Sequence, residues 1–430
     1  MVKLGSILNR LNPVKILVAG DLLVDSYIVG KAKRISPEAP VAIVNVQSEN
    51  HLPGGAGNVV LNLLSLGATA AVLGRVGDDW AGQLLLDSLH KEGVDTQMVA
   101  VQKDYITPIK SRVIADHQQI VRFDREEIKP LCPFLEKSLL DSLSSLLDQF
   151  KLIALSDYGK GFLTDSFLSG LIKLANQKGI PVITDPKGID YKKYSGSTIV
   201  KPNLSEAYAA ANLSRETPLE KVASSILAQC KSELLMITRS EEGISLFDNS
   251  GKRSDFPVIA KEVKDVTGAG DTVLAMLAHS HANGLSHAES AELCNAAASL
   301  AIEHVGCARI TQSDLAQRLF EQKMDCKVFD DNHLLVLKEL LKKKDYVLLI
   351  LPHDVAVMPS LFQAIKQAKI SSKELLICMD GMLKDETILE ILSSLQEVSF
   401  IVHRLESLKE LDFTLPLHTY SFYNQNLKKI

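Results

Sequence analysis

The chain has 430 residues, of which 46% are hydrophobic and 23% charged, so it exceeds one ordinary small domain and can bury a sizeable core. Forty-seven Lys and Arg against 52 Asp and Glu give a formal net charge of -5, which argues against nucleic acid or an anionic membrane as a partner. A phosphorylated substrate would therefore need cations that are gathered locally.

Short apolar runs rich in β-branched residues recur, and most of them precede a stretch with helical periodicity such as NVVLNLLSLG or DSFLSGLIKLANQKG. This alternation predicts βαβ units around a mainly parallel sheet. The predicted strands are KILVAG (15–20), AAVLGRVG (70–77), LIALSD (152–157), PVITD (181–185), STIVKPN (197–203) and LLMITRS (234–240).

Two features break the alternation. The stretch 39–47 and the region from Ile106 to Phe123 have strand patterns with little helix between them, so we expect a small side sheet or lid. The polar stretch 320–333 is the best domain boundary, and a helix-then-strand pattern repeats after it on a smaller scale. We therefore expect one domain over residues 1–322 and a smaller α/β domain over residues 330–430.

The six cysteines show no C-x-x-C pair and no metal-like spacing with histidine, so we expect neither a disulfide framework nor a zinc site. The first twenty residues lack a long apolar stretch with a cleavage site, and no run reaches the length of a spanning helix. These patterns predict a cytoplasmic protein that is neither secreted nor inserted in a membrane.

The stretch VKDVTGAGDTVLAML (263–277) places Gly268 and Gly270 between a short strand-like segment and an apolar helix. Free N–H groups and the positive end of the helix dipole would face this loop, so an anion could bind there with Asp271 beside it. A tight turn with Asp271 as a helix cap explains the pattern about equally well.

A second glycine cluster, LPGGAGNVVLNLLSLG (52–67), contains Gly54, Gly55 and Gly57 followed by Asn58. These glycines would let a ligand approach the backbone, and Asn58 can offer a donor and an acceptor to a hydroxyl. Tight packing of a helix on a strand is the alternative.

Four carboxylates follow predicted strands: Asp21 and Asp25 after 15–20, Asp157 after 152–156 and Asp185 after 181–184. Ligands of open α/β sheets bind outside the carboxyl ends of the strands, so these side chains would converge there on sugar hydroxyls. Each one alone could equally be a turn or cap residue.

Two further motifs suit a nucleotide. Asn203 and Glu206 lie three residues apart at a helix start, as in a capping box, and Glu206 could alternatively organise water around Mg²⁺. The stretch 234–247 is a strand, a polar turn with glycine and a second strand, which could line a nucleotide or form an ordinary hairpin.

The order of these motifs resembles the ribokinase or PfkB-type carbohydrate kinase family over about residues 15 to 315. Within it the chain is most similar to the kinases of D-glycero-D-manno-heptose 7-phosphate, which are usually half of a bifunctional heptose kinase/adenylyltransferase. The specific motifs are RISPEAPV (34–41), LSDYGKG (155–161), DPKG (185–188), PNLSE (202–206) and KDVTGAGDT (264–272).

The resemblance implies a ribokinase-like αβα layered domain with a small β lid, through which such kinases often dimerise, and ATP and Mg²⁺ as cofactors. It implies that Asp271 takes the proton of the acceptor hydroxyl while the N–H groups of Gly268, Ala269 and Gly270 hold the phosphoryl oxygens. The implied sugar contacts, including the strand-end acids, are Asp21, Asp25, Gly54, Gly55, Asn58, Asp157 and Asp185.

The remaining implied contacts concern the nucleotide and the phosphate of the sugar. Asn203 and Glu206 match the N-x-x-E motif for Mg²⁺ and phosphate. Thr238, Arg239 and Gly243 match the nucleotide loop, with Asn295 on the adenine side. Arg34, Lys160 and Lys187 are candidates for the sugar phosphate because they lie near these motifs in the sequence.

The carboxyl-terminal part departs from the bifunctional relatives. Residues 327–351 keep a strand-helix-strand outline, but the H-x-G-H loop is absent and His333 stands alone. We therefore expect no adenylyl transfer from residues 330–430, which would be either a decayed domain kept for packing or dimerisation, or an unrelated appendage.

The expected activity is phosphorylation of the C1 hydroxyl of heptose 7-phosphate, in the supply of heptose for lipopolysaccharide, by a homodimer with small-molecule partners only. There are two alternatives. The chain could phosphorylate another sugar or sugar phosphate, or it could be a sugar or nucleotide sensor without turnover.

Overall fold

The computed structural model describes residues 7–116, 118–258, 263–304, 306–322, 327–329, 337–338, 341, 344–369, 373–381, 387–402, 418–423 and 425–430. Contacts divide the chain into two compact units, Leu11–Thr311 and Met1–Arg10 with Gln312–Ile430. The division falls ahead of the polar stretch 320–333, because helix α10 (Gln312–Gln322) groups with the second unit.

The larger unit is built on a nine-stranded sheet in the order β13-β12-β11-β10-β9-β8-β1-β4-β5. The strands from β5 to β11 are parallel, whereas β12 and β13 are antiparallel additions at one edge. The bounds are β1 (Lys15–Gly20), β4 (Thr69–Gly77), β5 (Asp95–Gln102), β8 (Leu152–Ser156), β9 (Val182–Asp185), β10 (Ile199–Val200), β11 (Leu234–Thr238), β12 (Ile244–Asp248) and β13 (Arg253–Phe256).

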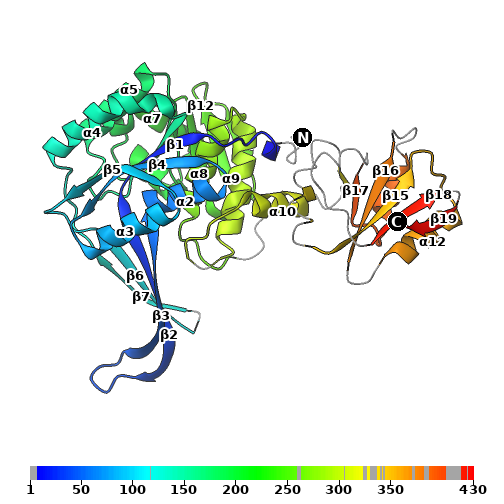
Figure 1. Ribbon diagram of the computed structural model, residues 1–430. Coiled ribbons are helices and arrows are strands. Elements are labelled where there is room, and N and C mark those ends of the chain that lie inside the picture. The colour runs from blue at the N-terminus through cyan, green and yellow to red at the C-terminus, as the bar shows by residue number, and fades with distance from the viewer. Residues whose placement is uncertain are drawn as a thin grey trace. The chain divides into compact units, whose positions relative to one another are not determined.

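Helices cover both faces of this sheet, which explains why its central strands are apolar at nearly every position rather than at alternate ones. Figure 1 shows α4, α5 and α7 on one face and α2, α8 and α9 on the other. The helices are α2 (Ala56–Ser65), α3 (Trp80–Lys91), α4 (Pro133–Leu146), α5 (Asp165–Gln177), α6 (Leu204–Ala211), α7 (Leu219–Cys230), α8 (Ala269–Ala282) and α9 (His287–Ala301), with short 3₁₀ turns η1 (Leu147–Gln149), η2 (Lys192–Tyr194) and η3 (Ser240–Glu242).

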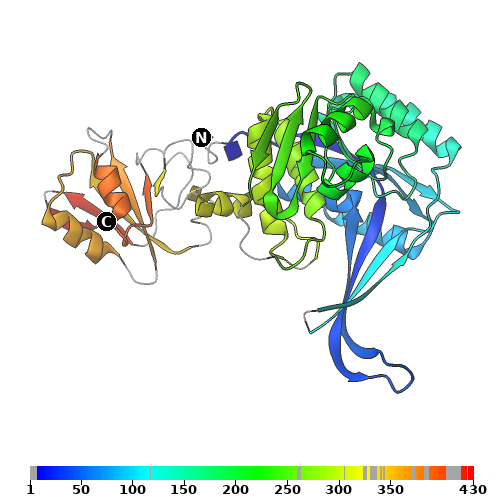
Figure 2. The ribbon, with the colours of Figure 1, turned by 180° about the vertical axis from the view of Figure 1, so that it is seen from behind.

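A separate four-stranded sheet in the order β3-β2-β6-β7 projects from this unit as a lid (Figures 1 and 2). Its strands are β2 (Leu22–Ile35), β3 (Ala42–Gly55), β6 (Ile109–Ala115) and β7 (Gln118–Arg125). One residue separates β1 from β2, and β3 runs directly into α2, so the root of the lid is continuous with the main sheet. The predicted αβα unit with a small β lid is therefore confirmed.

The second unit is also α/β, as its helix-then-strand pattern predicts. Its sheet has the order β14-β17-β16-β15-β18-β19 and is parallel except for β19. The bounds of these strands and of the helices between them are β14 (Val328–Phe329), β15 (Tyr346–Pro352), α12 (Pro359–Ala368), β16 (Glu374–Asp380), α13 (Thr387–Ser394), β17 (Phe400–Val402), β18 (Thr419–Tyr423) and β19 (Asn426–Lys429). His333 lies outside the described residues.

Throughout the described part of the chain, no helix has the length and apolar character that crossing a bilayer requires.

Candidate active site

The first turn of α8 forms an open cradle beside a buried carboxylate. Gly268 is the residue before the helix and has a φ of 76°, and a Cβ there would lie 2.8 Å from Asn58 Nδ2. A side chain at Gly270 would meet only Asp185 Oδ2, at 3.9 Å. The first-turn N–H groups have no partner within the helix, although Ala269 N–H reaches Val266 O at 3.3 Å. This turn can therefore receive an anion.

Asp271 is 3% exposed, and both of its carboxylate oxygens accept hydrogen bonds. Asn58 Nδ2 donates to Oδ2 and the Tyr158 hydroxyl donates to Oδ1, each at 2.8 Å. Burial raises the pKa of Asp271 to about 7, although these two hydrogen bonds lower it. A carboxylate with a pKa near neutral pH is suited to act as a general base.

Asn58 is itself held in one orientation. It lies in the first turn of α2, and its Oδ1 accepts a hydrogen bond from Asn62 Nδ2 at 3.1 Å. The amide nitrogen therefore faces Asp271. The sequence predicted a sugar contact for Asn58, whereas the structure shows it in contact with the candidate base.

Asp25 lies at the root of the lid and forms a buried ion pair with Arg112. Its Oδ1 is 2.6 Å from Arg112 Nη1, and its Oδ2 is 3.6 Å from Cys307 Sγ. A Cβ at Gly54 would lie 2.1 Å from Asp25 Oδ2, so glycine is needed there to admit the carboxylate. Gly55 completes the turn into α2 with a φ of 57°. The predicted group Asp25, Gly54, Gly55 and Asn58 is thus brought together.

Two of the predicted sugar contacts already have partners inside the protein. Asp21 is 1% exposed and accepts the N–H groups of Tyr158, Lys160 and Phe162 at 2.9–3.2 Å. Asp157 Oδ2 accepts from the Tyr194 hydroxyl at 2.6 Å and from a lysine ammonium at 2.8 Å. These carboxylates hold the loop that carries Tyr158.

The predicted cations for a sugar phosphate lie far along the lid or are already paired. Arg34 is exposed near the far end of β2, and its nine-residue separation from Asp25 along the strand corresponds to roughly 30 Å. Lys160 Nζ pairs with Glu126 at 2.6 Å, and Lys187 Nζ pairs with Glu206 at 2.9 Å. None of the three is therefore an unpaired cation beside Asp271.

Asp185 lies at the end of β9 and faces the cradle of α8. It forms an ion pair of 3.0 Å with the buried Lys201, while burial raises the pKa of Asp185. Asn203 and Glu206 form a complete capping box at the start of α6, so the capping interpretation holds and each side chain bonds the other's backbone. Asp185 and Glu206 are each paired with a lysine, and among the described residues no group of three or more His, Cys, Asp or Glu side chains is placed to hold a metal ion.

The predicted nucleotide residues lie along the neighbouring strands. Thr238 pairs with Asn203 by a parallel bridge. Arg239 is paired with Glu242 in the turn before Gly243, whose φ is 84°. Asn295 Nδ2 donates to the carbonyl oxygen of Phe256 at the end of β13, so this amide ties α9 to the strand edge.

The sequence interpretation missed five residues of the site. Tyr158 belongs to the quoted motif at 155–161, but nothing in the sequence places its hydroxyl on Asp271. Lys110 and Arg112 alternate along a predicted strand, which could have indicated a common face. The full set comprises Lys110, Arg112, Tyr158, Lys201 and Cys307.

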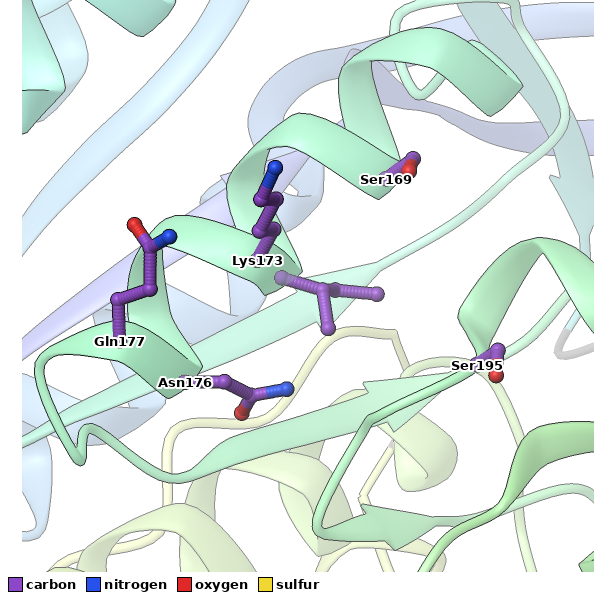
Figure 3. A pocket seen from close by; sticks show the side chains of 6 residues that line it. Ser169, Lys173, Asn176, Gln177 and Ser195 are labelled. Atoms are coloured by element: carbon purple, nitrogen blue, oxygen red, sulfur yellow. The ribbon is translucent and has the colours of Figure 1, made fainter.

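Figure 3 shows an open pocket of about 430 Å³ that lies elsewhere on the larger unit. Its lining comes from the carboxyl-terminal half of α5 and from the turn before β10. Because α5 runs back toward the amino ends of the strands, this pocket lies at the edge of the sheet opposite the carboxyl ends that carry Asp185. The lining residues are Ser169, Ile172, Lys173, Asn176, Gln177 and Ser195.

A profile of the pfkB family carbohydrate kinases matches residues 15–314 of the chain. The Bifunctional protein HldE of Trichlorobacter lovleyi is 43% identical over 327 residues, which are 75% of this chain and 67% of the relative. The Bifunctional protein HldE of Geobacter sulfurreducens is 42% identical over 316 residues, 73% of this chain and 64% of the relative. The chain thus matches about two thirds of the length of these relatives.

Solved structures share the fold at lower identity. The ribokinase of Arabidopsis thaliana complexed with ribose and ATP has a TM-score of 0.57 at 21% identity, over 71% of this chain and 99% of that one. The phosphofructokinase-2 of Escherichia coli in complex with fructose-6-phosphate has a TM-score of 0.59 at 20% identity, over 72% and 100%. The ribokinase-like fold that the sequence predicted is therefore confirmed.

Proposed function

Because the chain belongs to the pfkB family of carbohydrate kinases, we propose that it transfers the γ-phosphoryl group of ATP to the C1 hydroxyl of D-glycero-D-manno-heptose 7-phosphate. The product would be the 1,7-bisphosphate, an intermediate in the supply of heptose for lipopolysaccharide. One observation carries the proposal: the buried Asp271, held by Asn58 and Tyr158, lies beside the open first turn of α8. The similarity to the HldE proteins supports the heptose substrate.

In this reaction Asp271 accepts the proton of the sugar hydroxyl, whose oxygen then bonds to the γ-phosphorus as the bond to the leaving oxygen of ADP breaks. The two hydrogen bonds on Asp271 fix the carboxylate in place. N–H groups of the first turn of α8 stabilise the transferring phosphoryl group, since they and the helix dipole point at it from a preorganised position. Gly268, Ala269 and Gly270 provide this turn.

ATP would lie along the edge formed by Thr238, Arg239, Gly243 and Asn295. Asp185, Asn203 and Glu206 would hold Mg²⁺ directly or through water, and the ion supplies neutralisation of the phosphate charge. Lys201 already offsets one carboxylate of this group. The ion pair of Lys187 with Glu206 would adjust when the metal binds.

We place the enzyme in the cytoplasm as a homodimer that contacts its copy through the lid. Apolar side chains exposed on the lid support this assembly, because Ile35 is 71% exposed, Val46 58% and Phe123 52%. The unit that follows residue 312 would pack or assemble without transferring an adenylyl group.

An ATP-consumption assay over a panel of sugars and sugar phosphates tests the function. We expect turnover with heptose 7-phosphate, and a loss on the order of 10²–10⁴-fold in Asp271→Asn if the carboxylate acts as the base. Activity on an unphosphorylated hexose alone would refute the substrate and keep the kinase. Binding of sugar and ATP without turnover would instead identify a sensor.

A further inference from the structure

We propose that Lys110 binds the phosphate that the sugar substrate already carries, and that it thereby selects phosphorylated over unphosphorylated sugars. This inference rests on the proposed function, because it assigns one contact within the substrate site of that kinase. It replaces Arg34, Lys160 and Lys187, which the structure places at the far end of the lid or in ion pairs.

Lys110 lies on β6 at the root of the lid, where it is paired with Asp25 in the register between β2 and β6. Its Nζ is 4.7 Å from the centre of the Tyr158 ring, and the hydroxyl of that ring donates to Asp271. One phenol ring therefore separates the ammonium from the base. A sugar with one hydroxyl at Asp271 spans a similar length and brings a substituent at its other end to Lys110.

The charge of Lys110 has no carboxylate partner in the described part of the chain, where none lies within 4.0 Å of its Nζ. The side chain is half-buried, and removal from water lowers the pKa of Lys110. The charged groups around it include Asp25, Glu126 and Asp124, which favour its charge, and Lys160 and Arg122, which oppose it; Asp124 lies opposite Lys110 in the register between β6 and β7.

The neighbouring cations differ from Lys110 because each has its own carboxylate. The pairs are Arg112 with Asp25, Arg122 with Asp124 and Lys160 with Glu126, each at 2.6 Å. Of these four cations, Lys110 is the one without an ion pair. The unpaired positive charge is therefore that of Lys110, which contacts the Tyr158 ring whose hydroxyl bonds Asp271.

A phosphate monoester is a better partner for the unpaired ammonium of Lys110 than a hydroxyl is. A partly desolvated ammonium without a counterion is unfavourable, and a neutral ligand leaves it so. A phosphate carries close to two negative charges and three acceptor oxygens, so it can pair with the ammonium of Lys110. In a chain of net charge -5, this is a local concentration of positive charge beside the base.

The test is steady-state kinetics of the full chain with heptose 7-phosphate and with the unphosphorylated heptose. Lys110→Met should raise the KM for the phosphorylated sugar about 10–100-fold, because a charge-assisted contact is lost, and should leave kcat near wild type. The KM for the unphosphorylated heptose should not change. Lys110→Arg, which keeps the charge, should recover most of the loss.

Lys173→Met is the matched control, because Lys173 is an exposed lysine of α5 beside the pocket in Figure 3 and should alter neither KM. An unchanged KM for heptose 7-phosphate in Lys110→Met would overturn the inference and leave the kinase in place. A raised KM for ATP instead would assign Lys110 to the nucleotide and overturn it as well.

Calorimetric binding of heptose 7-phosphate without ATP keeps the inference separate from turnover. If the wild type binds the sugar phosphate but does not phosphorylate it, the proposed function fails, while weaker binding by Lys110→Met still supports the contact. Equal affinities of the two proteins would refute the contact. If the wild type does not bind the sugar phosphate at all, both proposals fail.

Discussion

Replacing Tyr158 with Phe should raise the pH at which the kinase becomes active. The hydroxyl of Tyr158 donates to Asp271 Oδ1 at 2.8 Å, and this bond lowers the pKa of Asp271 against the larger, raising effect of burial. Its loss removes a stabilising contact from the ionised base and leaves the ring in place. The acid limb of the profile of kcat/KM against pH should therefore move upward.

The size of the shift follows from the strength of the lost bond. A hydrogen bond to a charged group contributes about 1.5–3 kcal/mol, and 1.36 kcal/mol corresponds to one pKa unit, so the shift is about 1–2 units. The pKa of Asp271 would rise from about 7 to about 8–9. At pH 7 the ionised fraction then falls from about one half to roughly 1–10%, which lowers kcat/KM about 5–50-fold.

The assay is the pH dependence of kcat/KM between acid and alkaline pH for wild type and Tyr158→Phe. The matched control is Tyr191→Phe, because the buried hydroxyl of Tyr191 has no hydrogen-bond partner in the described structure and its loss should not move the limb. Recovery of Tyr158→Phe activity toward pH 9 is expected. An acid limb that coincides with wild type, or that lies at lower pH, refutes this role of the hydroxyl.

Three further predictions concern the same unit. Gly268→Ala and Gly93→Ala should each lose about 1–2 kcal/mol of stability, because an L side chain is strained at their positive φ. Only Gly268→Ala should also lose turnover, because its methyl group would lie 2.8 Å from Asn58 Nδ2, whereas a methyl group at Gly93 has no atom within 4 Å. Arg112→Met should lower the free energy of unfolding by about 3–5 kcal/mol, because it leaves a buried carboxylate unpaired, whereas Lys178→Met breaks an exposed pair worth about 0–1 kcal/mol. Asp271→Asn should gain thermal stability relative to wild type as pH rises. In wild type the folded state favours the protonated carboxyl of Asp271, whose pKa is raised to about 7. This contribution to the stability of wild type is complete below about pH 4 and is lost as the pH rises through about 7.

Each of these has a contradicting result. Equal turnover of the two glycine variants would show that the added methyl does not disturb the base. Equal losses in denaturant unfolding of Arg112→Met and Lys178→Met would mean that burial of the first pair has no energetic weight. A constant difference in melting temperature between Asp271→Asn and wild type from pH 5 to pH 8 would exclude ionisation of the buried acid in that range.

The sheet and the glycine turn could be predicted because their signals are local. Runs such as LIALS and LLMIT are apolar at every position but the last, as expected of strands covered on both faces. The lid was visible because two strand patterns lacked an intervening helix. The loop at 264–272 shows its glycines and its acid within nine residues.

The role of each strand-end acid could not be predicted, because it depends on partners distant in the sequence. Asp21 meets backbone groups 137 to 141 residues away, and Asn58 meets Asp271 across 213 residues. Asp21, Asp157 and Asp185 all follow buried strands and look alike in the sequence. Only the fold shows that two hold a loop and that the third faces the cradle of α8.

Because the lid strands continue directly into the main sheet, a movement of the lid changes the surroundings of the candidate base Asp271. Asp25 and Lys110 lie on strands of the lid, whereas Asn58 and Asp271 both belong to the main body, where α2 packs against α8. With no linker at the pivot, a tilt of the lid moves Asp25 and Lys110 relative to Asp271. The charge of Asp25 raises the pKa of Asp271, so such a tilt changes the proton affinity of the base as well as the contacts to the sugar. A cross-link that fixes the lid should therefore change the pH of half-maximal turnover as well as its rate.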